Sequence, residues 1–139
     1  MNAPELVKAK IIKGDIFMSS MSDPYQPVEK ELELTKKILE NLNKDARLSI
    51  LTKSDLVLRD INLLKQFKNL EVGFTINDFE GKTKDLMEPF APNYKLRLEA
   101  LKKLSKIGIK TYVFVSPIIP GLINLKKIID STKNYTDHY

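Results

Sequence analysis

The sequence contains no cysteine and only one histidine, and these two shortages exclude several kinds of site. Without cysteine the chain forms no disulfide, holds no metal through thiolates and has no cysteine nucleophile. His138 stands next to the last residue in a polar segment, so a catalytic triad and a zinc site also lack their parts. We expect His138 to be a solvated residue near the chain end.

Long apolar runs are also missing from the sequence. No stretch approaches the roughly twenty apolar residues that a membrane-spanning helix needs, and the first residues lack the apolar core of a secretory signal. We therefore expect a cytoplasmic protein with no membrane partner. The length of 139 residues leaves room for one domain with a sizeable core.

The charge balance is basic, with 23 lysines and arginines against 18 aspartates and glutamates and a formal net charge of +5. Such an excess is compatible with an anionic partner such as nucleic acid. However, lysines alternate with glutamates, as over residues 29–31, and this pattern is typical of solvated helix faces. The charge alone therefore gives nucleic-acid binding only weak support.

Apolar and β-branched runs alternate with helical patterns along the chain. The runs are typical of buried parallel strands and cover residues 16–20, 48–52, 71–75 and 110–115. Helical periodicity predicts helices over residues 4–13, 28–42, 61–67 and 94–107. Asp60 and Asn93 are the expected caps of the last two helices, and Gly108 is an expected left-handed stop.

The order of these elements predicts an α/β protein. Strand starts lie roughly 25 to 40 residues apart, which is the size of a βα unit with a right-handed crossover. The sequence thus predicts about four consecutive βα units in one domain. Residues 131–139 are polar, and we expect them to form a frayed tail.

Polar residues follow each predicted strand, and the carboxyl ends of parallel strands meet at one edge of a sheet. In chain order they are Ser20, Ser22 and Asp23; Thr52, Lys53 and Ser54; Thr75, Asn77 and Asp78; and Ser116. This set suits a ligand with an ammonium group, a carboxylate and sugar hydroxyls. Each residue taken alone is more often part of a turn or a helix start, and Arg97 is more often a surface or salt-bridge residue than an anion clamp. Four such sets at the ends of four strands nevertheless favour a ligand site.

The loop over residues 22–27 stands out in this set. Two prolines fix the backbone around Tyr25 and Gln26, and Pro27 precedes a helical pattern, so the loop is held rigidly where a strand gives way to a helix. Ligands of α/β proteins bind at such points.

Five segments resemble, in order, the radical S-adenosylmethionine proteins related to spore photoproduct lyase. They are FMSSMSDPYQPVE (17–29), SILTKS (49–54) with LRD (58–60), VGFTIN (72–77), EPFAP (88–92) with RLEAL (97–101), and PIIPGLIN (117–124). The resemblance extends from residue 2 to about residue 130. It implies a partial (β/α)6 barrel as a single domain over residues 1–130, followed by the tail at 131–139.

The resemblance also implies a cofactor and its contacts. In that family a four-iron, four-sulfur cluster cleaves S-adenosyl-L-methionine to a 5′-deoxyadenosyl radical. Ser22 and Asp23 fall where the methionine amino group is recognised. Lys53 and Thr75 fall where its carboxylate and the ribose are contacted, and Arg97 is expected to assist at the carboxylate. Asn77 and Ser116 complete the predicted cofactor-binding set, and the loop over residues 117–121 falls near the adenine.

The sequence departs from the family in its cluster ligands. Members hold the cluster with a Cys-x-x-x-Cys-x-x-Cys loop, because thiolates bind such iron centres, and this chain has no cysteine. Ser20 stands near the position of the hydrogen-donor cysteine in spore photoproduct lyase. The leading interpretation is a radical S-adenosylmethionine enzyme fragment that is inactive alone.

Two other interpretations remain open. The chain is alternatively a cluster-free module that binds S-adenosylmethionine or a nucleotide, or a basic nucleic-acid accessory protein. Because a parallel sheet that lacks flanking strands exposes its edges, we also expect the chain to associate with itself or with a second chain that supplies the cluster loop.

Overall fold

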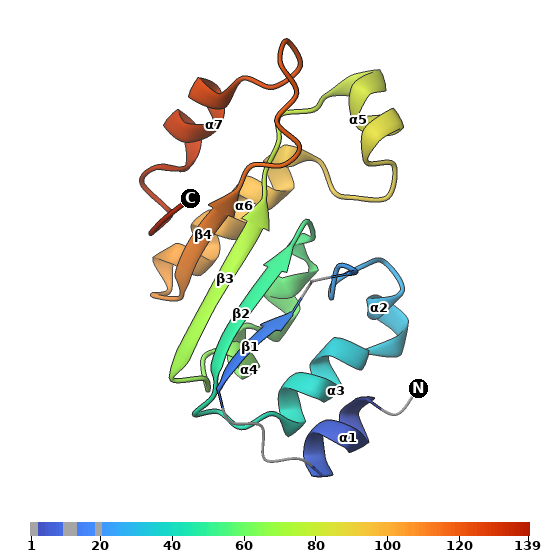
Figure 1. Cartoon of the computed structure of the whole chain (residues 1–139), viewed down its shortest axis with the longest axis vertical. Coiled ribbons are helices and arrows are strands. Elements are labelled where there is room, and N and C mark those ends of the chain that lie inside the picture. The colour runs from blue at the N-terminus through green and yellow to red at the C-terminus, as the bar shows by residue number, and fades with distance from the viewer. Residues whose placement is uncertain (1–2, 10–13, 19–20) are drawn as a thin grey trace.

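One parallel sheet organises the molecule. The computed structural model describes residues 3–9, 14–18 and 21–139. Four strands lie side by side in chain order (Figure 1): β1 (Asp15–Met18), β2 (Arg47–Thr52), β3 (Asn69–Thr75) and β4 (Lys110–Phe114). All neighbouring pairs are parallel. The prediction of an α/β fold with successive parallel strands is therefore confirmed, and the arrangement is consistent with part of a TIM-like barrel.

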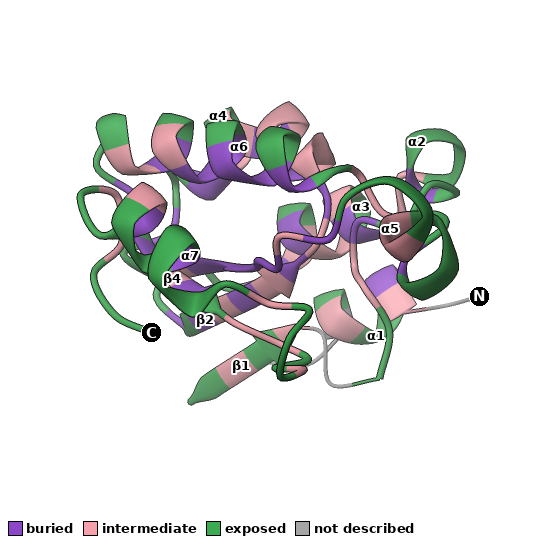
Figure 2. Cartoon of the chain, turned by 90° about the horizontal axis from the view of Figure 1, so that it is seen from above, coloured by how far each residue is buried: buried purple, intermediate pink, exposed green. Residues whose placement is uncertain are grey.

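Helices precede, connect and follow the strands, and α6 packs on one face of the sheet. They are α1 (Ala3–Ala9), α2 (Glu29–Leu32), α3 (Leu34–Asn41), the 3-10 helix η1 (Asp55–Asp60), α4 (Ile61–Leu64), α5 (Gly81–Met87), α6 (Tyr94–Lys106) and α7 (Leu125–Thr132). Figure 2 shows α6 turning its buried side toward the sheet. Leu48, Ile50, Val72, Phe74 and Val113 point into this layer and are fully buried.

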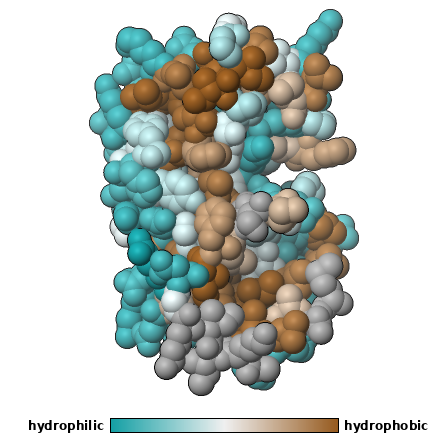
Figure 3. All heavy atoms as spheres, viewed as in Figure 1, coloured by the Kyte–Doolittle hydropathy of each residue, from teal (hydrophilic) through white to brown (hydrophobic). Residues whose placement is uncertain are grey.

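The opposite face of the sheet is more exposed. Side chains alternate along each strand, so residues between the core positions point away from the helices. Phe17 and Phe114 on this face are 53% and 49% exposed. Figure 3 views the molecule from this side, where apolar residues run along the sheet and continue toward its upper end. Because parallel sheets are normally covered on both faces, this surface is unusual.

The predicted helix over residues 28–42 is interrupted, so that prediction was wrong. Glu33 has φ 48° in the left-handed region and separates α2 from α3. The break places the Glu29 carboxylate at the start of α3, where it accepts hydrogen bonds from the backbone N–H groups of Thr35 (3.0 Å) and Lys36 (3.3 Å). Glu29 thus satisfies amide groups that an uninterrupted helix would have satisfied internally.

The predicted helix caps are confirmed at one position and wrong at another. The Asn93 side chain accepts from the backbone N–H of Leu96, and Gly108 follows α6 with φ 81°. The Asp60 side chain does not cap α4, because both of its oxygens accept from Arg59. The distal parts of the predicted helix 4–13 and strand 16–20, residues 10–13 and 19–20, lie outside the described residues.

The expected fraying of the tail is wrong as well. The backbone N–H of Asp137 donates to the carbonyl of Thr111 (2.8 Å), and that of Val113 donates to the carbonyl of His138 (3.1 Å). His138 forms a parallel bridge with Tyr112 and stacks on its ring at 5.1 Å. The tail orders because β4 lies at the sheet edge, where its open backbone groups accept a further strand-like segment.

Within the described part of the chain, no helix combines the length and the apolar character that crossing a bilayer requires.

Candidate site at the carboxyl edge of the sheet

Three of the predicted site residues converge on one carboxylate, that of Glu88. This residue follows α5 and is buried. Its Oε1 accepts from Asn77 Nδ2 (2.9 Å) and lies 3.1 Å from Lys53 Nζ. Its Oε2 accepts from Arg97 Nη2. A network of charged groups therefore joins the ends of β2 and β3 to the start of α6.

Arg97 fixes this network to the sheet. Its side chain is 1% exposed, its Nη1 donates to the carbonyl of Thr75 (3.1 Å), and its Nε donates to the carbonyl of Pro92 (2.9 Å). A weaker contact of 3.5 Å links Asn77 Nδ2 to the carbonyl of Ser116 beyond β4. The structure thus brings five of the seven predicted residues together around Glu88.

The other two predicted residues lie in the loop after β1. The carboxylate of Asp23 accepts from Thr52 Oγ1 (2.6 Å) and from the backbone N–H groups of Tyr25 (2.8 Å) and Lys53 (2.7 Å). An ionised carboxylate has about four acceptor positions, so Asp23 keeps room for one further donor. Ser22 is exposed beside it, and Ser20 lies outside the described residues.

The network carries a net positive charge. Burial alone would raise the pKa of Glu88, but the hydrogen bond and charge of Arg97, with further hydrogen bonds from Asn77 and Lys53, lower this pKa below its usual value. Glu88 is therefore ionised at neutral pH and balances one of the two cations. Because the Lys53 side chain remains 38% exposed, its ammonium can also contact an anionic ligand.

A cavity of about 500 Å³ opens beside Lys53. Its apolar lining comes from the loop after β1 (Tyr25 and Pro27), from η1 (Leu56) and from the segment after α5 (Phe90 and Pro92). Asp23 and Lys53 also line the cavity. The cavity combines apolar walls with a few charged groups, as small-molecule sites do.

Comparison of the sequence with known protein families identifies the superfamily to which the chain belongs. The sequence profile of the Radical SAM superfamily matches residues 3–130. The chain belongs to the radical SAM superfamily. Full-length members use S-adenosylmethionine and a four-iron, four-sulfur cluster. This chain contains no cysteine and so offers no cluster ligands, and its described residues include no group of three His, Asp or Glu side chains able to hold a metal ion.

Two relatives are uncharacterised proteins. The chain is 56% identical over 138 residues to the uncharacterized protein MJ0683 of Methanocaldococcus jannaschii, covering 99% of this chain and 53% of that protein. It is 38% identical over 107 residues to the uncharacterized protein ORF301 of Acidianus two-tailed virus, covering 76% of this chain and 35% of that protein. The chain therefore spans about half of one relative and about a third of the other. No solved structure matches it.

Glu88 is the member of the network that the sequence pattern did not identify as a site residue. It follows a short helix and precedes a proline, which is typical of a loop. A buried arginine needs an anionic partner, but nothing local in the sequence shows that Arg97 is buried. The pairing of Arg97 with Glu88 therefore became visible only with the fold.

Proposed function

We propose that this chain forms the wall of a radical SAM barrel that holds S-adenosylmethionine. The observation that carries the proposal is the Glu88 network, which gathers Lys53, Asn77 and Arg97 at the carboxyl edge of the sheet and leaves the Lys53 ammonium partly exposed to meet a carboxylate. This edge is where parallel α/β proteins bind ligands. Membership of the radical SAM superfamily supports S-adenosylmethionine as the ligand.

The residues have different roles in this proposal. Lys53 Nζ contacts the methionine carboxylate as a charge-assisted partner, and the remaining acceptor position of Asp23 receives the methionine ammonium, with Ser22 beside it. The Ser116 hydroxyl serves the ribose, and the buried Thr75 and Asn77 support this part of the site, where Asn77 donates to Glu88 and to the carbonyl of Ser116. Arg97 is buried and fully engaged with Glu88, Thr75 and Pro92, so it supports the site by holding these groups in place.

The four-iron, four-sulfur cluster is not part of the function that we propose for this chain alone. In full-length members it supplies the electron that cleaves S-adenosylmethionine, and thiolates hold it. The residues of this chain do not fit that group, because the sequence has no cysteine. We therefore propose that the chain alone carries out no radical chemistry.

Calorimetry with S-adenosylmethionine tests the proposed binding. We expect the unaltered chain to release or absorb heat in a saturable way, and Lys53→Ala to weaken the affinity about tenfold, the loss typical of one hydrogen bond to a charged group. Asp23→Ala should weaken it as well. Lys126→Ala is a matched control, because Lys126 is 87% exposed and pairs with Asp130 on α7. Absence of binding by the unaltered chain would refute the proposal.

Anaerobic reconstitution with iron and sulfide tests the catalytic part separately. We expect no charge-transfer absorbance in the visible range from the chain alone. A stoichiometric cluster on the purified chain would overturn the statement that it cannot hold one, without affecting the calorimetric result.

The finer assignment, to the branch related to spore photoproduct lyase, is also a proposal. Its support is the order of the five segments described above, including the loop over residues 22–27. A solved structure of the chain checks it by superposition. If the region from β1 to β4 fitted spore photoproduct lyase no better than other radical SAM barrels, the branch assignment would be abandoned.

We also propose that the exposed face of the sheet is covered by a second polypeptide, either another copy of this chain or a chain that brings the cluster loop. The half-exposed Phe17 and Phe114 support this. Light scattering at increasing concentration should give a mass above that of the monomer. A monodisperse monomer with a cooperative, high thermal transition would count against self-association.

A further inference from the structure

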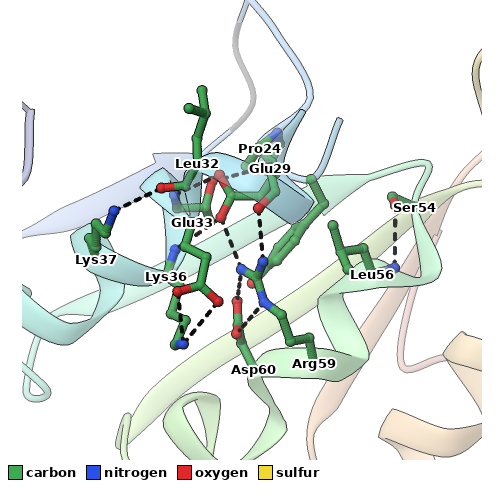
Figure 4. Close-up of polar contacts among 12 residues, drawn as sticks. Pro24, Glu29, Leu32, Glu33, Lys36, Lys37, Ser54, Leu56, Arg59 and Asp60 are labelled. Atoms are coloured by element: carbon green, nitrogen blue, oxygen red, sulfur yellow. Dashed lines mark hydrogen bonds and ion pairs between the residues drawn. The ribbon is translucent and has the colours of Figure 1, made fainter. Parts of the chain in front are cut away.

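Arg59 joins two segments that are far apart in the sequence. It lies in η1, and its guanidinium reaches the start of α2 (Figure 4). Its Nη1 donates to the carbonyl of Glu29 and its Nη2 to Glu29 Oε1, both at 2.9 Å. On its other side Nε donates to Asp60 Oδ1 (2.9 Å) and Nη2 to Asp60 Oδ2 (2.8 Å). Arg59 thus lies between two carboxylates that are each only 3% exposed.

Glu29 extends this contact to the loop after β1. Its two carboxylate oxygens accept from the backbone N–H groups of Thr35 and Lys36 at the start of α3. The hydroxyl of Thr35 in turn donates to the carbonyl of Pro24. A continuous chain of hydrogen bonds therefore runs from Arg59 to the loop that carries Ser22 and Asp23.

The same loop is attached to β2 on its other side. Asp23 accepts from the hydroxyl of Thr52 and from the backbone N–H of Lys53. Tyr25 is fully buried between these attachments, and its burial together with the nearby Asp60 charge raises the pKa of its hydroxyl. Lys53 and Arg59 belong to one continuous segment, so Arg59 locks the loop against the same segment that presents Lys53.

The chemistry of arginine suits this position. A guanidinium presents its donors in a flat fork and can serve two carboxylates at once, whereas a lysine ammonium is a single point charge. Without Arg59, Glu29 and Asp60 would be two buried carboxylates close together, and each would be destabilised by the loss of its cation. The loop and η1 would then separate to let water reach them.

We propose that Arg59 is a positioning residue for the ligand site: through Glu29 it holds the loop over residues 22–27 against the end of β2. It does not touch the ligand. Its role is to keep Ser22 and Asp23 at the correct distance from Lys53. The part of this inference that concerns ligand affinity rests on the proposed function, whereas the part that concerns loop position does not.

Amide hydrogen exchange on the ligand-free chain tests the loop position directly. The informative amides are those of Tyr25, Thr35, Lys36 and Lys53, because their acceptors are the carboxylates of Asp23 and Glu29. In Arg59→Ala we expect their exchange to accelerate about tenfold, the effect of losing one charge-assisted hydrogen bond. Amides of β3, such as those of Val72 and Phe74, serve as the internal reference.

A merely structural role would give a different result. If Arg59 only added to global stability, the β3 amides would accelerate in proportion and the ratio of loop to core exchange would stay unchanged. Arg59→Lys should resemble Arg59→Ala, because one ammonium cannot replace the fork. Arg47→Ala is the control, since Arg47 is 68% exposed and lies 3.7 Å from its partner Asp15. An unchanged ratio in Arg59→Ala overturns the inference whether or not the chain binds a ligand.

Calorimetry with S-adenosylmethionine adds the second arm. We expect Arg59→Ala to weaken binding by about tenfold, similar to Lys53→Ala, although Arg59 makes no ligand contact. Binding by Arg59→Ala equal to that of the unaltered chain would show that the loop position does not matter to the ligand and would overturn the inference. Absence of binding by the unaltered chain would instead refute the proposed function, and the exchange ratio would still decide the role of Arg59 in the loop.

Discussion

Replacement of Arg97 by alanine is expected to lower the free energy of unfolding by about 3 to 5 kcal/mol, because breaking a buried ion pair leaves the remaining charge uncompensated. Arg97 is 1% exposed and Glu88 6% exposed at the side chain, so solvent cannot replace the lost contact without rearrangement. The carbonyls of Thr75 and Pro92 lose their side-chain donors at the same time. Urea denaturation followed by circular dichroism measures the loss.

The exposed Arg47 provides the matched control for this prediction. Arg47 pairs loosely with Asp15 on the opposite edge of the sheet, and exposed pairs contribute roughly 0 to 1 kcal/mol. Arg47→Ala should therefore change the free energy of unfolding by less than about 1 kcal/mol. A similarly small effect of Arg97→Ala would mean that Arg97 is solvated and that the Glu88 network does not hold the site together.

Acidification offers a second readout of the same network. The pKa of Glu88 lies below its ordinary value of 4.5, so its contribution to stability is present above that pH and is lost as the pH falls through the lower folded-state value. In Arg97→Ala the main cause of the depression is removed while burial remains, so the pKa of Glu88 should rise. The stability difference between the two proteins, measured by urea denaturation at several pH values, should therefore narrow as the pH falls from the higher Glu88 pKa of the variant through the lower Glu88 pKa of the unaltered chain.

The elements that the sequence predicted best are those with a local cause. Buried parallel strands read as continuous apolar runs, and β2, β3 and β4 lie within a residue or two of the predicted ranges. Asn93 and Gly108 act within one turn of their own helix, so their roles were also visible. The break at Glu33 was not, because it depends on the Glu29 carboxylate capping α3.

In the candidate site, too, features with a local cause were predictable from the sequence and features that depend on long-range contacts were not. The strand-end rule placed Lys53, Thr75 and Asn77 at one edge of the sheet, and the structure confirms that they lie there. The rule could not show that Asp23 already accepts three hydrogen bonds or that Glu88 joins the set. Both facts depend on contacts between residues that are distant in the sequence, and charge pattern alone does not reveal such pairs.

The tail shows the opposite error, in which a local signal misleads. Residues 131–139 are polar and lie at the end of the chain, two features typical of disorder. The edge of β4 nevertheless binds Asp137 and His138 through backbone hydrogen bonds. Backbone groups are the same in every residue, so a polar composition says little about whether a free strand edge will accept the segment.

Gly73→Ala is expected to destabilise the protein by about 3 kcal/mol, at the upper end of the cost of overpacking. A Cβ atom at Gly73 would lie 2.2, 2.3 and 2.6 Å from three atoms of the Tyr112 ring. Gly73 is in β3 with ordinary extended backbone geometry, so alanine adds no backbone strain and the effect comes from this contact. Thermal and urea unfolding measure it.

The Tyr112 ring can move away only by giving up contacts. It stacks on His138 at 5.1 Å, and its hydroxyl lies 3.3 Å from Ser49 Oγ, so a shift breaks two contacts on the exposed face of the sheet and loosens the tail from β4. Tyr112→Ala in the Gly73→Ala background removes the overlap and should recover part of the loss, giving a favourable coupling in a double-mutant cycle. Additive effects of the two substitutions would show that a Cβ atom at Gly73 and the Tyr112 ring do not meet.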